Sequence, residues 1–283
     1  MGDDRFVTLV RLAGRSRPGV VDSVMDQLVV EHRSDAGDGD RVAVIAHWST
    51  KALVSRSLSA LARSFVDRQY RVVLCSSAPV PDRLRLPDDL ADKVTVLRKP
   101  NVGYDFGSWA VAQAWDPSIR QARHVILAND SLAGPFGDLG EVISRCEVSH
   151  ADVFGLTSTT QFGPHLQSYF LGFNGGVLAD SQLAAFWQGV RHERDKTSVI
   201  HRNEIGLGNL LRREGFSQDA AFPYWKVVED GLNPTIRGWR GLLELGFPFL
   251  KREILRTPTV APGGDQAPDV LRRMFGVEVK DWL

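Results

Sequence analysis

The feature that most constrains the fold of this sequence is a series of apolar runs without polar alternation. They are RVAVIAHWS (residues 41–49), YRVVLCSS (70–77), KVTVL (93–97) and HVILA (124–128). Each run is followed by Gly, Pro, Ser or Asp and then by helix-compatible sequence. An uninterrupted apolar run is typical of a strand that is covered on both faces. We therefore predict an α/β fold in which helices flank a parallel sheet.

The composition indicates which partners to expect. The chain has 283 residues, and its 34 Lys and Arg are balanced by 34 Asp and Glu, so no net charge attracts nucleic acid or an anionic membrane. Its two cysteines, Cys75 and Cys146, are too few for a disulfide framework and lack the spacing of metal ligands. We expect a reducing compartment, and hence the cytoplasm.

We expect no export signal and no membrane span. Asp3 and Asp4 stand where a signal peptide would be basic, and no apolar run reaches the roughly 18 residues that a spanning helix needs. Any association with a membrane would be peripheral.

The remaining segments have a less regular pattern. We predict a helix over residues 20–31 and a mobile linker over 34–40, which is rich in Ser, Asp and Gly. Beyond residue 151 we predict strands at 152–156 and 168–178, helices at 182–190 and 204–215, and helical structure from Asn233 to the end. We expect Trp109, Trp115 and Trp187 to pack inside, together with at least two of the aromatic residues Tyr169, Phe170 and Phe173.

In an open α/β sheet, ligands bind at the carboxyl ends of the strands. The segments at these ends are HWST (47–50), SSAP (76–79), KPNVGYD (99–105) and NDS (129–131). No phosphate-binding loop and no G-x-G-x-x-G follows the first strand, which disfavours a P-loop NTPase or an ordinary dinucleotide dehydrogenase.

Two of these segments have residues that suit a phosphate or a metal. Asn129, Asp130 and Ser131 offer hard oxygen atoms of the kind that Mg²⁺ or Mn²⁺ takes when it also holds a diphosphate. In 99–105, Gly103 lets the backbone approach a ligand, and Asp105 is placed to cap the following helix. Both segments can also be read as ordinary turns, with Asp130 capping the turn before Gly134.

A third segment suits a sugar. Residues 163–176 combine His165 and Gln167 with aromatic residues and a glycine pair, and imidazole and amide groups bind sugar hydroxyls. His165 and Gln167 are therefore candidate sugar contacts.

Several longer stretches resemble the rhamnan-synthesis F family, glycosyltransferases of bacterial rhamnose-polysaccharide assembly. These stretches are IAHWS, NVGYDFGSW, LANDSLAGPF, HLQSYFLGF, NEIGLGNLLRREGF and NPTIRGWRGLLELGFPFLKREILR, in order from about Val42 to about Arg256. The resemblance implies a glycosyltransferase fold of the GT-A type, with a Rossmann-like, mostly parallel sheet flanked by helices. It divides the chain into an N-terminal helix and linker (1–40), a nucleotide-binding half (41–131), an acceptor-side half (132–232) and a C-terminal helical extension (233–283).

The resemblance also implies roles for the strand-end residues. In GT-A enzymes an Asp-x-Asp motif holds a divalent ion on the donor diphosphate, and here residues 129–131 occupy its place with Asp130 as the single carboxylate. Asp130 is thus the expected ligand of Mg²⁺ or Mn²⁺, with Lys99 or Arg98 as alternative partners of the diphosphate. The residues expected around the nucleotide are His47, Trp48, Ser49, Ser76, Ser77, Asn101, Gly103, Asp105, Asn129 and Asp130.

Glu204 is the candidate catalytic base. NEIGLGNLLRREGF is similar to the Glu-Asp-x-Asp-Leu stretch of inverting GT-A enzymes, which places Glu204 at the base, Leu207 at the leucine and Gly215 at the helix exit. The acceptor hydroxyl must lose a proton as it attacks the anomeric carbon, and a carboxylate can accept it. The alternative is an exposed glutamate that the helix dipole favours in a first turn.

The expected function is that of an inverting glycosyltransferase. It would transfer L-rhamnose from a dTDP-linked donor to a surface polysaccharide or a lipid-linked glycan, in the cytoplasm or at the inner face of the membrane. The alternatives are a non-catalytic sugar- or nucleotide-binding component of an assembly complex and a sugar-phosphate transferase. The basic residues of the extension either contact the donor phosphate or a lipid-diphosphate acceptor at the membrane surface, or they form a solvated face. These residues are Arg237, Arg240, Lys251, Arg252 and Arg256.

Overall fold

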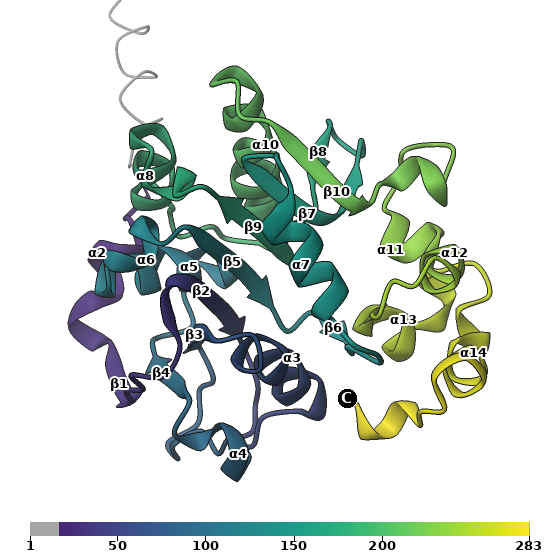
Figure 1. The fold of residues 1–283 in the computed structure, drawn as a ribbon, viewed down its shortest axis with the longest axis horizontal. Coiled ribbons are helices and arrows are strands. Elements are labelled where there is room, and N and C mark those ends of the chain that lie inside the picture. The colour runs from purple at the N-terminus through teal and green to yellow at the C-terminus, as the bar shows by residue number, and fades with distance from the viewer. Residues whose placement is uncertain (1–16, 283) are drawn as a thin grey trace, which may run out of the picture.

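A central sheet with helices on both faces forms the body of the computed structural model, which describes residues 17–282 (Figure 1). The strands are β1 (Val29–His32), β2 (Asp38–His47), β3 (Tyr70–Ser76), β4 (Val94–Arg98), β5 (His124–Asn129), β6 (Leu132–Ala133), β7 (Val153–Thr159), β8 (His165–Leu166), β9 (Phe170–Asn174), β10 (Gln218–Phe222) and β11 (Leu250–Lys251). The large sheet has the order β1-β4-β3-β2-β5-β9-β7-β10, with β8 paired to β7.

The pairing directions place most strand ends at one edge. β4, β3, β2 and β5 run parallel to one another, and β9 lies antiparallel between β5 and β7. β7 therefore points the same way as β5, and β10 is parallel to β7. The carboxyl ends of all these strands except β9 lie at the same edge, which we call the carboxyl edge. The predicted α/β fold with a mostly parallel sheet flanked by helices is confirmed.

The helices form two layers. The α-helices before the C-terminal extension are α2 (Val20–Val24), α3 (Arg56–Val66), α4 (Asp88–Ala91), α5 (Tyr104–Trp115), α6 (Ser118–Gln121), α7 (Gly140–Val148), α8 (Ser181–Gln188), α9 (Lys196–Val199) and α10 (Ile205–Arg213). The π-helix η3 (Ile200–Glu204) joins α9 to α10. The 3-10 helices are η1 (Met25–Gln27), η2 (Val177–Ala179), η4 (Tyr224–Lys226), η5 (Pro258–Val260), η6 (Gly264–Gln266) and η7 (Val279–Asp281).

Strand β2 shows why its run of apolar residues is uninterrupted. Val42 and Val44 pack into one hydrophobic cluster with α2, α5, α8 and α10, whereas Ala43 and Ile45 pack into another with α3 and α7. Because successive side chains of a strand point to opposite faces, a strand covered on both sides needs apolar residues at every position.

The predicted aromatic core is largely confirmed. Trp109 and Trp187 are fully buried, and Trp115 packs against the core only in part. Tyr169, Phe170 and Phe173 are buried as well. The Trp109 indole donates a hydrogen bond of 3.0 Å to the Ala128 carbonyl, which satisfies its buried N–H.

The structure corrects the prediction for the N-terminal segment. The expected helix over 20–31 ends after α2 and η1, because Val29–His32 form the edge strand β1, antiparallel to β4. The β-branched Val29 and Val30 suit a strand, and Glu31 pairs with Arg98 of β4 at 2.8 Å. The expected linker over 34–40 is anchored, since the buried Ser34 hydroxyl donates to the Asp92 carbonyl at 2.7 Å and β2 begins at Asp38.

The C-terminal extension has a small core of its own. It contains α11 (Pro234–Arg237), α12 (Trp239–Glu244), β11, α13 (Arg252–Arg256) and α14 (Ala267–Phe275), drawn in light green and yellow at the right of Figure 1. β11 pairs with β6, and the chain returns to α3, where the Ser57 hydroxyl donates to the Trp282 carbonyl at 2.6 Å.

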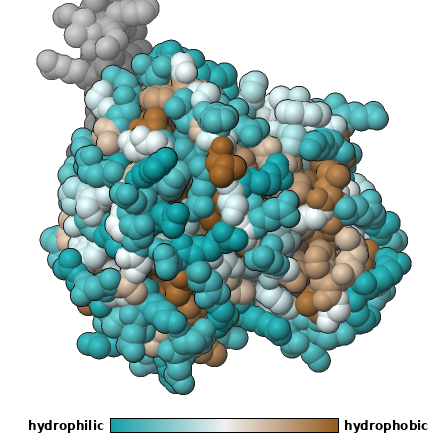
Figure 2. All heavy atoms as spheres, in the orientation of Figure 1, coloured by the Kyte–Doolittle hydropathy of each residue, from teal (hydrophilic) through white to brown (hydrophobic). Residues whose placement is uncertain are grey.

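The surface is mostly polar in the view of Figure 2, with hydrophobic residues gathered over the extension at the right. Between residues 17 and 282, the helices are all too short or too polar to cross a bilayer.

Candidate active site

His47, Ser76 and Asp130 meet at the carboxyl edge. The His47 Nδ1 and Ser76 Oγ atoms lie 3.0 Å apart, and His47 Nε2 lies 3.9 Å from Asp130 Oδ2. The same Asp130 oxygen accepts a hydrogen bond of 3.3 Å from the Trp48 backbone N–H. Adjacent parallel strands thus bring together three of the residues that we predicted around the nucleotide.

Burial changes the charge of this group. His47 is only 4% exposed, and burial, together with the positive charges of Arg98 and Arg252, lowers its pKa to about 4. His47 is therefore neutral near pH 7, and its contact with Asp130 is not an ion pair. Burial, reinforced by the charge of Asp105, raises the pKa of Asp130 to about 7. The Asp130 side chain nevertheless keeps 22% of its surface exposed, so a ligand can reach it.

Asn129 connects the end of β5 to the start of α5. Its Nδ2 donates to Asp105 Oδ2 at 2.7 Å, and its Oδ1 accepts from the Ser131 N–H at 3.1 Å. Burial is the main reason why the pKa of Asp105 rises to about 6. Contrary to our expectation, Asp105 does not cap α5, because the helix begins at Tyr104 and the N-cap residue is Gly103.

The other predicted nucleotide residues differ in their accessibility. Gly103 has φ of +84°, and a Cβ atom there would lie 2.6 Å from a Val20 methyl group, so its glycine is required by the fold itself. Asn101 is exposed, and the half-buried Ser49 hydroxyl accepts from the Lys51 N–H at 3.0 Å. Ser77 is buried, with its N–H bonded to the His47 carbonyl.

Glu204 approaches the site from the other half of the sheet. It is the last residue of η3, and its Oε1 accepts a 2.7 Å hydrogen bond from the Ser168 N–H. Helical structure runs without a break from α9 through η3 into α10, and Glu204 is half-buried. The reading of Glu204 as an exposed residue in a first helical turn is therefore wrong. π-Helical turns often occur at functional sites.

Gln167 and His165 make internal bonds. The Gln167 amide accepts from the Thr157 hydroxyl at 2.6 Å and donates to Asn233 Oδ1 at 3.1 Å. The ring of the buried His165 lies 2.7 Å from the Gly163 carbonyl. Their role as sugar contacts stays a prediction.

The two basic residues that we offered as partners of the diphosphate already hold loops. Lys99 is buried, and its ammonium donates to the carbonyls of Pro100 and Val102 at 3.1 and 2.6 Å. The Arg98 guanidinium donates to three carbonyls, those of Ala78, Val80 and Asp82.

Two of the basic residues that we offered as possible phosphate contacts, Lys251 and Arg252, lie at the site. Arg252 donates from Nε to the carbonyls of Asp130 and Leu132 at 3.0 and 3.1 Å, and from Nη2 to the Ser55 hydroxyl. Lys251 places its ammonium 5.6 Å from the centre of the Tyr169 ring. In the sequence, the two residues are visible only as a Lys-Arg pair in a segment of basic, aromatic and leucine residues. The pairing of β11 with β6 shows that this pair lies beside Asp130.

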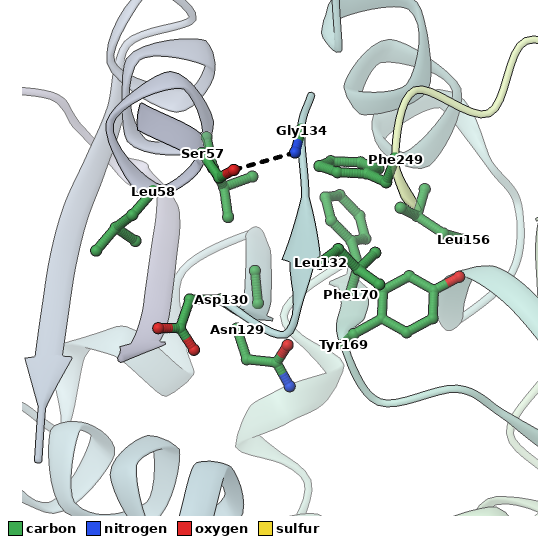
Figure 3. A pocket seen from close by; sticks show the side chains of 12 residues that line it. Ser57, Leu58, Asn129, Asp130, Leu132, Gly134, Leu156, Tyr169, Phe170 and Phe249 are labelled. Atoms are coloured by element: carbon green, nitrogen blue, oxygen red, sulfur yellow. Dashed lines mark hydrogen bonds between the residues drawn. The ribbon is translucent and has the colours of Figure 1, made fainter. Parts of the chain in front are cut away.

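A small void is lined by Asn129 and Asp130, among others. Its volume is about 10 Å³, which is space for a water molecule at most, so it cannot hold a larger ligand. In Figure 3 the polar groups of Asn129 and Asp130 lie at one end of the lining, far from Phe249. The Ser57 hydroxyl accepts a hydrogen bond of 3.2 Å from the Gly134 N–H.

The site suits a divalent ion only together with a substrate. Within residues 17–282 there is no group of three or more His, Cys, Asp or Glu side chains that could hold a metal. Mg²⁺ commonly binds through one or two carboxylates and takes its other ligands from phosphates and water. The accessible carboxylate of Asp130 fits that arrangement.

Comparisons with known proteins identify the family of this chain. The "Virulence protein VirA" of Vibrio anguillarum is 28% identical over 211 residues, which cover 62% of this chain and 68% of VirA. The "Uncharacterized protein y4gN" of Sinorhizobium fredii is 28% identical over 155 residues, or 53% of this chain. The chain spans only 40% of the length of y4gN. The family described as "Rhamnan synthesis protein F" matches residues 71–277, more than half of the chain and most of the site. The chain therefore belongs to the rhamnan synthesis protein F family.

Proposed function

We propose that this protein is an inverting glycosyltransferase that transfers a sugar from a nucleoside diphosphate donor to a hydroxyl group of a glycan. The observation that carries the proposal is that three carboxylates, which come from both halves of the sheet, lie close enough to act on one another at the carboxyl edge. Asp105 and Asp130 come from the first half of the sheet and Glu204 from the second, and the charge of Glu204 acts on Asp105.

In the reaction, Glu204 is the base. The Ser168 N–H holds its Oε1, which leaves the second oxygen for the acceptor hydroxyl. As that hydroxyl oxygen forms its bond to the anomeric carbon, its proton passes to Glu204, and the bond from the carbon to the donor phosphate breaks. The nucleoside diphosphate leaves with the bonding electrons. A divalent ion held by Asp130 would stabilise the charge on this leaving group.

The donor would lie along the ends of β2, β3 and β5. The Trp48 ring, 49% exposed, offers a surface for the base, next to the neutral His47 and to Asp130. The family supports a role in rhamnan synthesis. In this proposal the donor is dTDP-linked L-rhamnose.

The acceptor would lie beyond the end of β7. Phe162 follows that strand, is 66% exposed, and has its ring 5.3 Å from the ring of His201 in η3. His201 precedes Glu204 by three residues in η3, so a sugar whose apolar face stacks on Phe162 would have its hydroxyls near the base. The acceptor in this proposal is a polysaccharide or a lipid-linked glycan at the inner face of the membrane. The free, buried thiols of Cys75 and Cys146 suit the reducing cytoplasm.

The test is to incubate the purified protein with dTDP-L-rhamnose and a rhamnose-containing acceptor, with Mg²⁺, with Mn²⁺ or with EDTA. We expect release of dTDP and an acceptor that is heavier by one deoxyhexose. An acceptor that is heavier by a sugar phosphate would instead identify a sugar-phosphate transferase.

A second candidate is a non-catalytic component that binds nucleotide sugars. It is favoured by Asn129, which stands at a carboxylate position of the expected motif and whose amide is bonded to Asp105. Under this candidate, Glu204→Gln would keep the protein's effect on polysaccharide assembly in cells, whereas a transferase would lose it.

A further inference from the structure

The ammonium group of the half-buried Lys251 has no protein acceptor within the described residues. Within the part of the chain that the structure describes, it makes no hydrogen bond and no ion pair, and it lies over the Tyr169 ring, 5.6 Å from the ring centre. Burial is the main reason why its pKa is lowered. Its Nζ atom is not among the fully buried polar atoms without a partner, so water reaches it, and a bound anion could take the place of that water.

The backbone fixes where this ammonium lies. Lys251 pairs with Leu132 in the antiparallel contact of β11 with β6, two residues beyond Asp130. The adjacent Arg252 holds β11 in place through its bonds to the carbonyls of Asp130 and Leu132. β11 therefore cannot move away without breaking these hydrogen bonds and its pairing with β6.

Tyr169 links Lys251 to both parts of the site. Its carbonyl accepts a hydrogen bond of 3.2 Å from the Asn129 N–H, and the N–H of the preceding Ser168 holds Glu204. The Lys251 ammonium thus lies near both the segment that would hold the diphosphate and the proposed base. The charges of Glu204 and Asp105 act on it, yet neither carboxylate forms an ion pair with it.

We propose that Lys251 is the cation that binds the phosphate groups of the donor and of the departing nucleoside diphosphate. This inference rests on the proposed function, because it assigns a partner to the leaving group of that reaction. A lysine ammonium is a compact charge with three donors, which suits phosphate oxygens. The C-terminal extension then completes the active site, a role that Lys99 and Arg98 cannot take while they hold loop carbonyls.

The experiment measures the binding of dTDP, dTMP, thymidine and inorganic pyrophosphate to the full chain by calorimetry. It compares the wild type with Lys251→Met, Lys251→Arg and a control, Lys280→Met, which removes an exposed lysine of the same extension. Charge-assisted hydrogen bonds suggest that Lys251→Met weakens dTDP binding roughly 10- to 100-fold. Thymidine should bind the variant as it binds the wild type, Lys251→Arg should recover part of the loss, and Lys280→Met should bind all four probes normally.

Two results would overturn the inference. One is dTDP binding to Lys251→Met with wild-type affinity. The other is an equal loss for thymidine and dTDP in a variant whose thermal unfolding is unchanged, since this would make the lysine a support of the nucleoside pocket. If the Lys251→Met protein does not fold, the inference is tested with Lys251→Arg instead. This variant has to bind dTDP more tightly than thymidine for the inference to stand. If the wild type binds neither dTDP nor pyrophosphate, the proposed function itself fails.

Discussion

Protonation of His47 should destabilise the folded protein strongly at acid pH. Burial lowers its pKa from 6.5 to about 4. As the pH falls, His47 therefore gains its proton in the unfolded chain before it does so in the folded protein. The neutral ring contributes fully to the free energy of unfolding above pH 6.5, and this contribution is lost progressively as the pH falls to about 4. With about 1.4 kcal/mol for each pH unit over this interval, the loss is roughly 3 kcal/mol.

The neighbours of His47 do not relieve this cost. Asp130 is the carboxylate beside it, but the pKa of Asp130 is raised to about 7, so it becomes neutral before His47 gains a proton. Arg98 and Arg252 oppose a positive charge on the ring. His47→Asn is the matched perturbation, because an asparagine amide can replace Nδ1 in the bond to Ser76 but has no proton to gain.

The assay is urea unfolding of the wild type and of His47→Asn at several values between pH 7 and pH 4. Other titrating groups are shared and cancel in the difference between the two proteins. We expect the free energy of unfolding of the wild type to fall by about 3 kcal/mol more than that of the variant. Parallel curves would refute the reasoning. A wild type that gains stability relative to the variant in acid would show instead that His47 is protonated and paired with Asp130.

Three further predictions concern single positions. Glu204→Gln should lower kcat by about 10²- to 10⁴-fold in a steady-state assay of dTDP release, while calorimetry should show unchanged dTDP affinity. A variant that loses only its affinity for dTDP would exclude Glu204 as the base. Phe162→Ala should raise the KM for the acceptor several-fold without changing dTDP affinity, because about 1 kcal/mol of stacking energy is lost. An unchanged KM would place the acceptor elsewhere. Gly103→Ala should cost about 2 kcal/mol or more in thermal unfolding, because the strain of a positive φ is joined by the contact with Val20. Gly246→Ala is the control, because Gly246 has φ of +89° but open space around it, and this variant should lose less stability. Equal losses for the two variants would show that the contact with Val20 is unimportant.

The parallel core of the fold could be predicted from the sequence because its signal is local. An apolar residue at every position of β2 is what burial on both faces demands, and the polar residues after it had to lie at a strand end. The meeting of His47, Ser76 and Asp130 follows from that topology alone.

Features that depend on distant partners could not be predicted in this way. Residues 29–32 became a strand because β4 offers an edge for them, although the preceding residues have a helical pattern. Lys251 joined the site through a two-residue strand whose partner is far away in the sequence. Lys99 was a reasonable phosphate ligand until the structure showed its ammonium bonded to the Pro100 and Val102 carbonyls. Charge and residue type are visible in a sequence, but the bonds that already occupy a side chain are not.

The bond network of Arg252 has a practical consequence for anyone who wishes to shorten this protein. A chain that ends at residue 232, where the sequence suggests a boundary, would lose the guanidinium that ties the Asp130 turn to Ser55, together with the strand that pairs with β6. It would also expose the face of α3 on which Trp282 rests. We expect such a fragment to fold poorly and to bind no nucleotide. The last fifty residues should therefore be kept in any version that is made for crystallisation or for fusion to another domain.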